Sequence, residues 1–169
     1  MTIYADQIFP AGGEAGQGGG IIQVARSFHT SALSYTMNGN YHTVNMSVSI
    51  TPRSSSNKIL IMWDINTGTT GGSGGYFLGI RRSAPNASNI VDASATNAWG
   101  ITPTGGLSNG HLQSVNIPMF WIDEPNTTAT CTYSPRAYGV GGTSTLYFNR
   151  TQNYASGGRS QMLLFEVSS

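Results

Sequence analysis

The run from Tyr41 to Asn66 constrains the fold of this chain more than any other segment. Over Tyr41–Ile50 polar and apolar residues alternate, which predicts a strand with one wet face and one dry face. A polar break around Pro52 stops the ladder. Lys58–Ile65 is then almost wholly apolar, as expected of a central strand buried on both faces. Together these segments predict an antiparallel β-structure with a core.

The rest of the chain favours the same fold class. Charged residues make up only 9% of the sequence, strong helix formers are scarce, and no long segment repeats with a period of 3.6. Turn signals recur about every ten residues, which fits a sandwich, a jelly roll or a Greek-key barrel. We expect an all-β fold, an antiparallel β-sandwich of the jelly-roll type. Strands are predicted at residues 21–28, 41–50, 58–65, 76–82, 89–91, 111–122, 128–133, 143–149 and 161–167.

The sequence divides into an extended N-terminal arm, residues 1–20, and a β-sandwich domain, residues 21–169. Met1–Pro10 is mildly apolar, and Ala11–Gly20 is rich in glycine. Ordering ten such residues costs on the order of 10 kcal/mol of backbone freedom. We therefore expect a neighbouring subunit or a partner protein to hold the arm, and an arm folded back on its own domain is the alternative.

Charge and hydropathy bound the possible partners. The formal net charge is +1, which provides no electrostatic footprint for nucleic acid. No run of about 20 apolar residues predicts a membrane span. The first twenty residues lack the basic start and apolar core of a signal peptide, so we expect synthesis in a cytoplasm.

No constellation of residues indicates catalysis, so we expect a protein that is not an enzyme and needs no metal or cofactor. The three histidines, His29, His42 and His111, lack the spacing of metal ligands. Asp64 stands in an apolar strand, where burial would require a partner for its charge. Cys131 is the single cysteine, and its place on a strand face predicts a small core residue.

Carboxylates and aromatic residues leave one binding alternative open. Asp123 and Glu124 are adjacent, so on a strand their side chains would face apart. Aromatic residues could stack on sugars, although in a β-sandwich they more often fill the core or subunit contacts. The aromatic residues in question are Trp99, Trp121, Tyr138 and Tyr154.

Five segments resemble a group of small bacteriophage virion proteins, common in cyanobacterial and marine phages. These segments are Gly18–Val24 (GGGIIQV), Ser47–Ile61 (SVSITPRSSSNKILI), Trp121–Pro125 (WIDEP), Tyr147–Arg150 (YFNR) and Phe165–Val167 (FEV). The acidic residue before Pro125 departs from the small residue that is usual there.

The resemblance implies a trimeric β-sandwich knob on the phage particle, either a capsid decoration (cement) protein or a tail-fibre tip. It brings no catalytic residues with it. Its homotrimer would need apolar contacts between subunits, and possible trimer contacts are Tyr76, Tyr147, Phe148 and Phe165.

Between these roles we expect the capsid decoration protein, located on the virion surface, because only twenty residues precede the domain and no stalk is visible. The arm would dock on the major capsid protein through its apolar side chains. The alternative is a tail protein that recognises host polysaccharide through the loop at residues 92–110. The predicted docking residues are Ile3, Tyr4, Ile8 and Phe9.

Overall fold

The computed structural model describes residues 20–70, 75–91, 114–140, 144–150 and 157–169, and within these ranges the regular structure is entirely β. Every strand pairing is antiparallel. The strands are β1 (Ile21–His29), β2 (Leu33–Met37), β3 (Tyr41–Thr43), β4 (Val48–Ile50), β5 (Lys58–Thr70), β6 (Gly75–Ala84), β7 (Ser88–Val91), β8 (Ser114–Asp123), β9 (Cys131–Val140), β10 (Ser144–Phe148) and β11 (Ser160–Val167).

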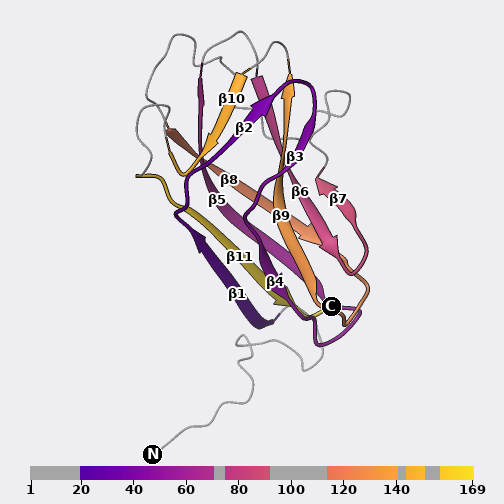
Figure 1. Cartoon of the computed structure of the whole chain (residues 1–169). Coiled ribbons are helices and arrows are strands. Elements are labelled where there is room, and N and C mark those ends of the chain that lie inside the picture. Colours follow the sequence, from indigo (N-terminus) through magenta and orange to yellow (C-terminus); the bar gives the residue numbers. More distant parts are fainter. Residues whose placement is uncertain (1–19, 71–74, 92–113, 141–143, 151–156) are drawn as a thin grey trace, which may run out of the picture.

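The strands form two sheets packed face to face (Figure 1). The first sheet has the order β1-β11-β5-β10-β2, with β8 on the other side of β5. The second has the order β3-β9-β6-β7, with β4 also on β9. Eight strands remain when β3 and β4 are counted as one strand and β2 and β10 are left out. In this set β1 pairs with β11, β3 and β4 pair with β9, β5 pairs with β8, and β6 pairs with β7. The first strand thus pairs with the last, and the pairing continues inward in that order. This pairing is that of a jelly roll, which confirms the expected fold class.

The core lies between the two sheets. It is built from alternate residues of the long strands, so that β5 contributes every second side chain and β11 does the same. The largest fully buried side chains are Trp63, Tyr133, Phe148, Met37, Ile59, Ile61, Ile65, Leu78, Ile80, Met119, Leu146 and Met162.

The segment predicted as one strand over residues 41–50 is two strands that share the partner β9. Between them, Val44 donates its backbone N–H to the carbonyl of Pro135 over 2.9 Å. In an antiparallel pair the N–H and C=O of one residue point to the same neighbour. Because Pro135 has no N–H to donate in return, the hydrogen-bond ladder between this segment and β9 is interrupted at Val44. Val44 and Met46 are nevertheless buried, as the alternation predicted.

The prediction that Lys58–Ile65 is buried on both faces is wrong. Its odd-numbered residues are fully or almost fully buried, while Leu60 and Met62 are half-buried and Asp64 is exposed. The second face of β5 therefore belongs to the outside of the sandwich.

Two further strands differ from expectation. β2 was not predicted, and β9 extends through Pro135 to Val140, beyond the predicted end at Tyr133. Among the described strands β8 pairs only with β5, so Pro118 stands in an edge strand, where its missing N–H interrupts no further ladder. A turn at residues 38–40 joins β2 to β3, and Gly39 adopts a positive φ of 81° there.

Candidate functional site, an apolar sheet face

The outer surface of the first sheet is the most unusual feature of the fold. Strands β1, β11, β5 and β8 lie side by side, and their registers align the outward-facing side chains in rows across the sheet. One row runs Val24, Phe165, Leu60, Ile122, and the next runs Arg26, Leu163, Met62, Phe120. A third row runs Phe28, Gln161, Asp64, Pro118, and a fourth joins Ile21, Val167 and Lys58. We call these residues together the outer apolar face.

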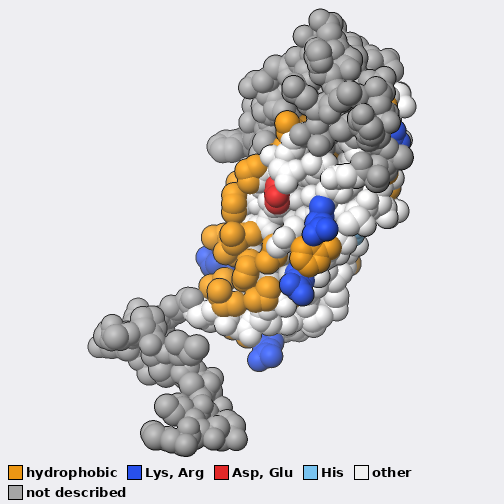
Figure 2. Space-filling model, turned by 90° about the vertical axis from the view of Figure 1, so that its left-hand side faces the viewer, with side chains coloured by type: hydrophobic (Ala, Val, Ile, Leu, Met, Phe, Trp, Pro, Cys, Tyr) orange, Lys and Arg blue, Asp and Glu red, His pale blue; other side chains and the backbone are white. Residues whose placement is uncertain are grey.

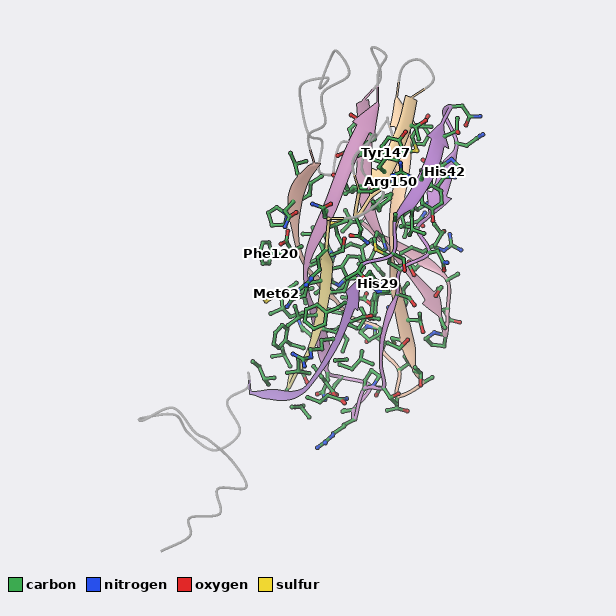
Figure 3. All side chains as sticks on the ribbon, turned by 60° about the vertical axis from the view of Figure 1, so that its left-hand side comes forward. His29, His42, Met62, Phe120, Tyr147 and Arg150 are labelled. Carbon is green, nitrogen blue, oxygen red and sulfur yellow. The ribbon has the colours of Figure 1, made fainter. Side chains whose placement is uncertain are left out.

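Side chains of the outer apolar face are open to solvent although they are large and apolar. Phe120 is 60% exposed, Ile122 57% and Val24 51%. Figure 2 shows apolar side chains gathered over this side of the molecule, with basic groups at the margin and one acidic group among them. In Figure 3, Met62 and Phe120 project together away from the sandwich. Contiguous apolar surface of this kind often belongs to a functional site.

The middle of the outer apolar face is slightly hollow. A shallow depression there is lined by residues of β5, β8 and β11, among them Met62, Phe120 and Leu163. Its polar groups are few, the Asp64 carboxylate and the Gln161 amide. The depression offers a seat for an apolar side chain of a partner and no array of groups that could perform a reaction.

Of the predicted trimer contacts, Tyr76 and Phe148 are core residues of the chain itself. Phe148 is fully buried, and Tyr76 is 6% exposed. The hydroxyl of Tyr76 shares a hydrogen bond of 2.7 Å with Thr67 across the sandwich, and burial raises the pKa of Tyr76 to about 12. Both rings are covered before a partner arrives, because they occupy inward positions of their strands, and they are not retained as subunit contacts.

The other two predicted contacts face outward and stay predictions. Phe165 is half-buried within the outer apolar face, between Val24 and Leu60. Tyr147 is half-buried on β10, where the guanidinium carbon of Arg150 lies 4.8 Å from its ring centre (Figure 3). The predicted docking residues Ile3, Tyr4, Ile8 and Phe9, and most of the arm, lie outside the described residues.

The structure shows the surroundings of Asp64 and Cys131, two residues that the sequence singled out. Asp64 is exposed and accepts a hydrogen bond of 2.9 Å from Asn116, so the buried charge that the sequence suggested does not arise. Cys131 is fully buried, as predicted, and burial raises the pKa of its thiol. Within the described part of the chain, no group of three or more His, Cys, Asp or Glu side chains could hold a metal ion. No helix in that part is long and apolar enough to cross a membrane.

The aromatic residues considered for sugar binding are not brought together where they can be seen. Trp121, 40% exposed, lies on β8 of the first sheet. Tyr138 lies on β9 of the second sheet and stacks on Tyr41, with ring centres 4.7 Å apart. Trp99 and Tyr154 fall outside the described residues.

A buried carboxylate holds one end of the sandwich. Glu166 on β11 is fully buried and accepts hydrogen bonds from Gln23 Nε2 (2.5 Å), Asn57 Nδ2 (2.6 Å) and the backbone N–H of Arg53 (2.7 Å). Burial acts to raise the pKa of Glu166, but these donors and the backbone at Ser54 outweigh it, and the net pKa is lowered. The cluster ties β1 and the loop before β5 to the last strand.

A second buried carboxylate joins the two sheets. Asp123, at the end of β8, accepts hydrogen bonds from Arg82 Nη1 (2.5 Å) and the Tyr133 hydroxyl (2.7 Å), both from the second sheet. Burial and the hydrogen bond to Asp123 raise the pKa of Tyr133, which keeps the phenol neutral. Burial lowers the pKa of Arg82, but the Asp123 charge outweighs it and the net pKa is raised. The neighbouring Glu124 instead faces out and pairs with Lys58 over 2.7 Å.

Sequence reasoning missed the outer apolar face as a surface. Its signal was present, because Ile59–Trp63 and the stretch Ile117–Ile122 are apolar at consecutive positions. Such a run is ambiguous between a strand buried within its own chain and a strand whose second face meets another molecule. Only the strand order shows that no segment of the described chain covers this face.

No protein-family model matches the sequence, and no curated protein sequence matches it. Solved structures of infectious bursal disease virus show a weak likeness. For the Gx strain, the TM-score is 0.45 at 11% identity, over 87% of this chain and 37% of that chain. For the VP2 subviral particle, the TM-score is 0.45 at 10% identity, over 88% of this chain and 40% of that chain. The chain thus spans well under half the length of the viral chains it matches.

Proposed function

We propose that this chain is a structural protein of a bacteriophage virion, a capsid decoration (cement) protein that sits as a homotrimer on the outside of the shell. The observation that carries the proposal is the outer apolar face. A contiguous sheet face that leaves Phe120 and Ile122 in water is typical of a surface that contacts another molecule. In an assembly the same face becomes buried and stabilises the contact by roughly 25 cal/mol for each Å² of apolar surface removed from water.

The residues that carry the phage resemblance support the proposal because they maintain the fold. Gln23, Asn57 and Glu166 come from three of the resembling segments and meet in one buried cluster. Asp123, from a fourth, joins the sheets. Asn149, from the fifth, is fully buried with a φ of 56° and accepts a hydrogen bond of 2.6 Å from Ser160. Motifs of this kind define a scaffold, as expected of virion proteins that share a shape and no chemistry.

The attachment of the arm supports the decoration role in particular. The backbone N–H of Gly20 donates to Ser168 Oγ, and its carbonyl accepts from the Ser168 N–H, both over 3.1 Å. The arm therefore starts from a fixed point next to Ile21, at the rim of the outer apolar face. Docked on the major capsid protein, each fully buried arm side chain would contribute about 1.5–3 kcal/mol. Three arms on one trimer would strengthen the grip through their effective concentration.

The copy number of the chain in purified virions tests the proposal. A decoration protein is expected in numbers comparable with the major capsid protein, as measured by quantitative gel densitometry or mass spectrometry of intact particles. A few copies confined to one vertex would contradict it and point to the tail protein instead.

A deletion tests the role of the arm. A chain lacking residues 1–19 retains every strand that the structure describes, so we expect it to unfold at the same temperature as the full chain. It should nevertheless fail to bind particles that lack the protein, while the full chain binds them. Equal binding by both chains would overturn the docking role of the arm.

A further inference from the structure

Two opposite charges stand on the outer apolar face without a partner of opposite charge among the residues that the structure describes. Arg26 is exposed on β1, next to Leu163, and its guanidinium carbon lies 5.3 Å from the ring centre of Phe28. Asp64 is exposed on β5 and contacts the amide of Asn116. In the described ranges the salt bridges are Lys58 with Glu124 and Arg82 with Asp123.

These two charges do not pair within the described part of one copy. Strand β11 lies between β1 and β5, and two strand spacings amount to roughly 10 Å. Arg26 also aligns with Met62 across the sheet, so that Asp64 lies one same-face step further along β5. The cation therefore marks the β1 side of the face, and the carboxylate marks the side toward β5 and β8.

We propose that the outer apolar face is covered by a second copy of this chain, with Arg26 of one copy paired to Asp64 of the next. A face that carries a cation on one side and a carboxylate on the other is complementary to itself. When the β1 side of one copy meets the β5 and β8 side of another, apolar rows cover apolar rows and Arg26 of one copy meets Asp64 of the other. Contacts between two different sides of one surface form a ring when the rotation between copies closes, and a three-membered ring would be the homotrimer proposed above.

The balance of charge argues against other occupants. An anionic membrane surface or a nucleic acid would call for a cluster of lysines and arginines. The outer apolar face has Arg26 alone on one side and a carboxylate on the other, while Lys58 is already paired with Glu124. A second copy is the partner whose charges match this arrangement.

The area of the face can be compared with that of a stable interface, although in a ring two neighbours share it. With strands spaced by about 4.8 Å and same-face residues by about 6.8 Å, the four rows on β1, β11, β5 and β8 cover roughly 500 Å². A stable interface buries about 800 Å² on each partner, with an apolar centre and a polar rim. The face therefore supplies only part of such a contact, with Arg26 on its β1 edge and Asp64 beside the depression at its middle.

Charge reversal tests the pairing across copies. Sedimentation and light scattering of the full chain should give three times the 17.9 kDa chain mass. R26D or D64R alone places like charges against each other across the contact, and we expect the dissociation constant for self-association to rise about tenfold or more. The double variant R26D/D64R restores opposite charges, and its dissociation constant should return to within about threefold of the starting value.

R81D is the matched control, because it makes the same charge change on the outer face of the second sheet. Its association should be unchanged, and thermal unfolding of each variant checks that the fold is kept. The inference is overturned if the unmodified chain is monomeric, if the single reversals leave association unchanged, if R81D weakens it equally, or if the double variant stays dissociated.

This inference deepens the proposed homotrimer, and it can fail separately from the decoration role. A chain that is monomeric in solution yet abundant on the capsid overturns the self-association and leaves decoration standing. A chain that associates through Arg26 and Asp64 but occurs in a few copies on the tail supports the self-association and overturns the decoration role.

Discussion

The side-chain amide of Asn57 donates a 2.6 Å hydrogen bond to the carboxylate of Glu166, and both residues are almost completely removed from solvent. This contact fixes the loop that precedes β5 against the last strand of the chain. Since Gln23 donates to the other carboxylate oxygen, segments from the beginning, the first third and the end of the domain converge on one charge.

Glu166→Gln should destabilise the fold by about 1–3 kcal/mol at neutral pH. The amide of the new side chain would present a donor to groups that are themselves donors, which leaves buried groups unsatisfied. Urea unfolding at pH 7 measures the difference between the two proteins. Glu124→Gln on the exposed surface serves as the control and should change the unfolding free energy by less than about 0.5 kcal/mol.

The same substitution predicts a pH dependence. The pKa of Glu166 is lower in the folded chain than its ordinary value of 4.5, so the unfolded state binds more protons over the acid range. The stability that this carboxylate contributes is present above the unfolded pKa and is lost as the pH falls through the folded pKa. The difference in unfolding free energy between the wild-type chain and Glu166→Gln should therefore shrink below about pH 4.5. A difference that stays constant down to pH 2 would contradict this origin.

Arg82→Met should cost about 3–5 kcal/mol, because it leaves the Asp123 carboxylate buried without its cation. Tyr133→Phe removes one neutral donor from the same carboxylate and should cost about 1 kcal/mol. Unfolding of both variants and of the double variant forms a cycle, and the coupling should be well above the error because the two groups share one acceptor atom. Additive losses would mean that the two contacts act independently.

Neighbouring residues on β8 should respond in opposite ways to truncation. Met119 is 1% exposed and faces the core, so Met119→Ala should lower the free energy of unfolding by about 2–5 kcal/mol. Phe120 is 60% exposed, and Phe120→Ala should change the unfolding of the monomer by less than about 0.5 kcal/mol. Its effect should instead be on association, measured by sedimentation. A large loss of monomer stability from Phe120→Ala would show that its ring is covered within the chain.

Gly158→Ala should destabilise by about 1–3 kcal/mol. A Cβ at this position would collide with the Asn66 side chain and lie 2.6 Å from the Cα of Asn149, at the junction where β10 and β11 meet β5. Gly20→Ala is the matched control, since a Cβ there would meet nothing within 4 Å. Thermal unfolding of the two variants compares them directly, and equal melting temperatures would show that the junction can rearrange.

The alternation of polar and apolar residues predicted buried positions well, but it did not predict where strand pairing is interrupted. The alternation over Tyr41–Ile50 gave the correct buried residues, yet it could not show that Pro135, distant in sequence, interrupts the ladder. The same proline concealed the length of β9, since a proline inside a run argues against a strand. Pro135 lies in β9 between the residues that pair with β3 and those that pair with β4, so its missing N–H removes no hydrogen bond from either pairing.

The candidate site depended on information that a linear pattern does not hold. Tyr76 and Phe148 looked like contact residues because they are aromatic, but only strand direction decides that both point inward. Phe120 and Ile122 belong to a continuous surface because β8 pairs with β5 and aligns them with Met62 and Leu60, and the sequence does not show this pairing. Arg26 and Asp64 lie on two strands that β11 separates, and no spacing in the sequence reveals this strand order.

A cryo-electron microscopy reconstruction of the intact virion tests most directly whether the outer apolar face is a contact between proteins. The account predicts this chain in groups of three over the capsid surface, with Phe120, Ile122 and Val24 covered by a neighbouring copy. A reconstruction in which the chain is absent from the capsid, or in which this face looks out into solvent, would contradict it.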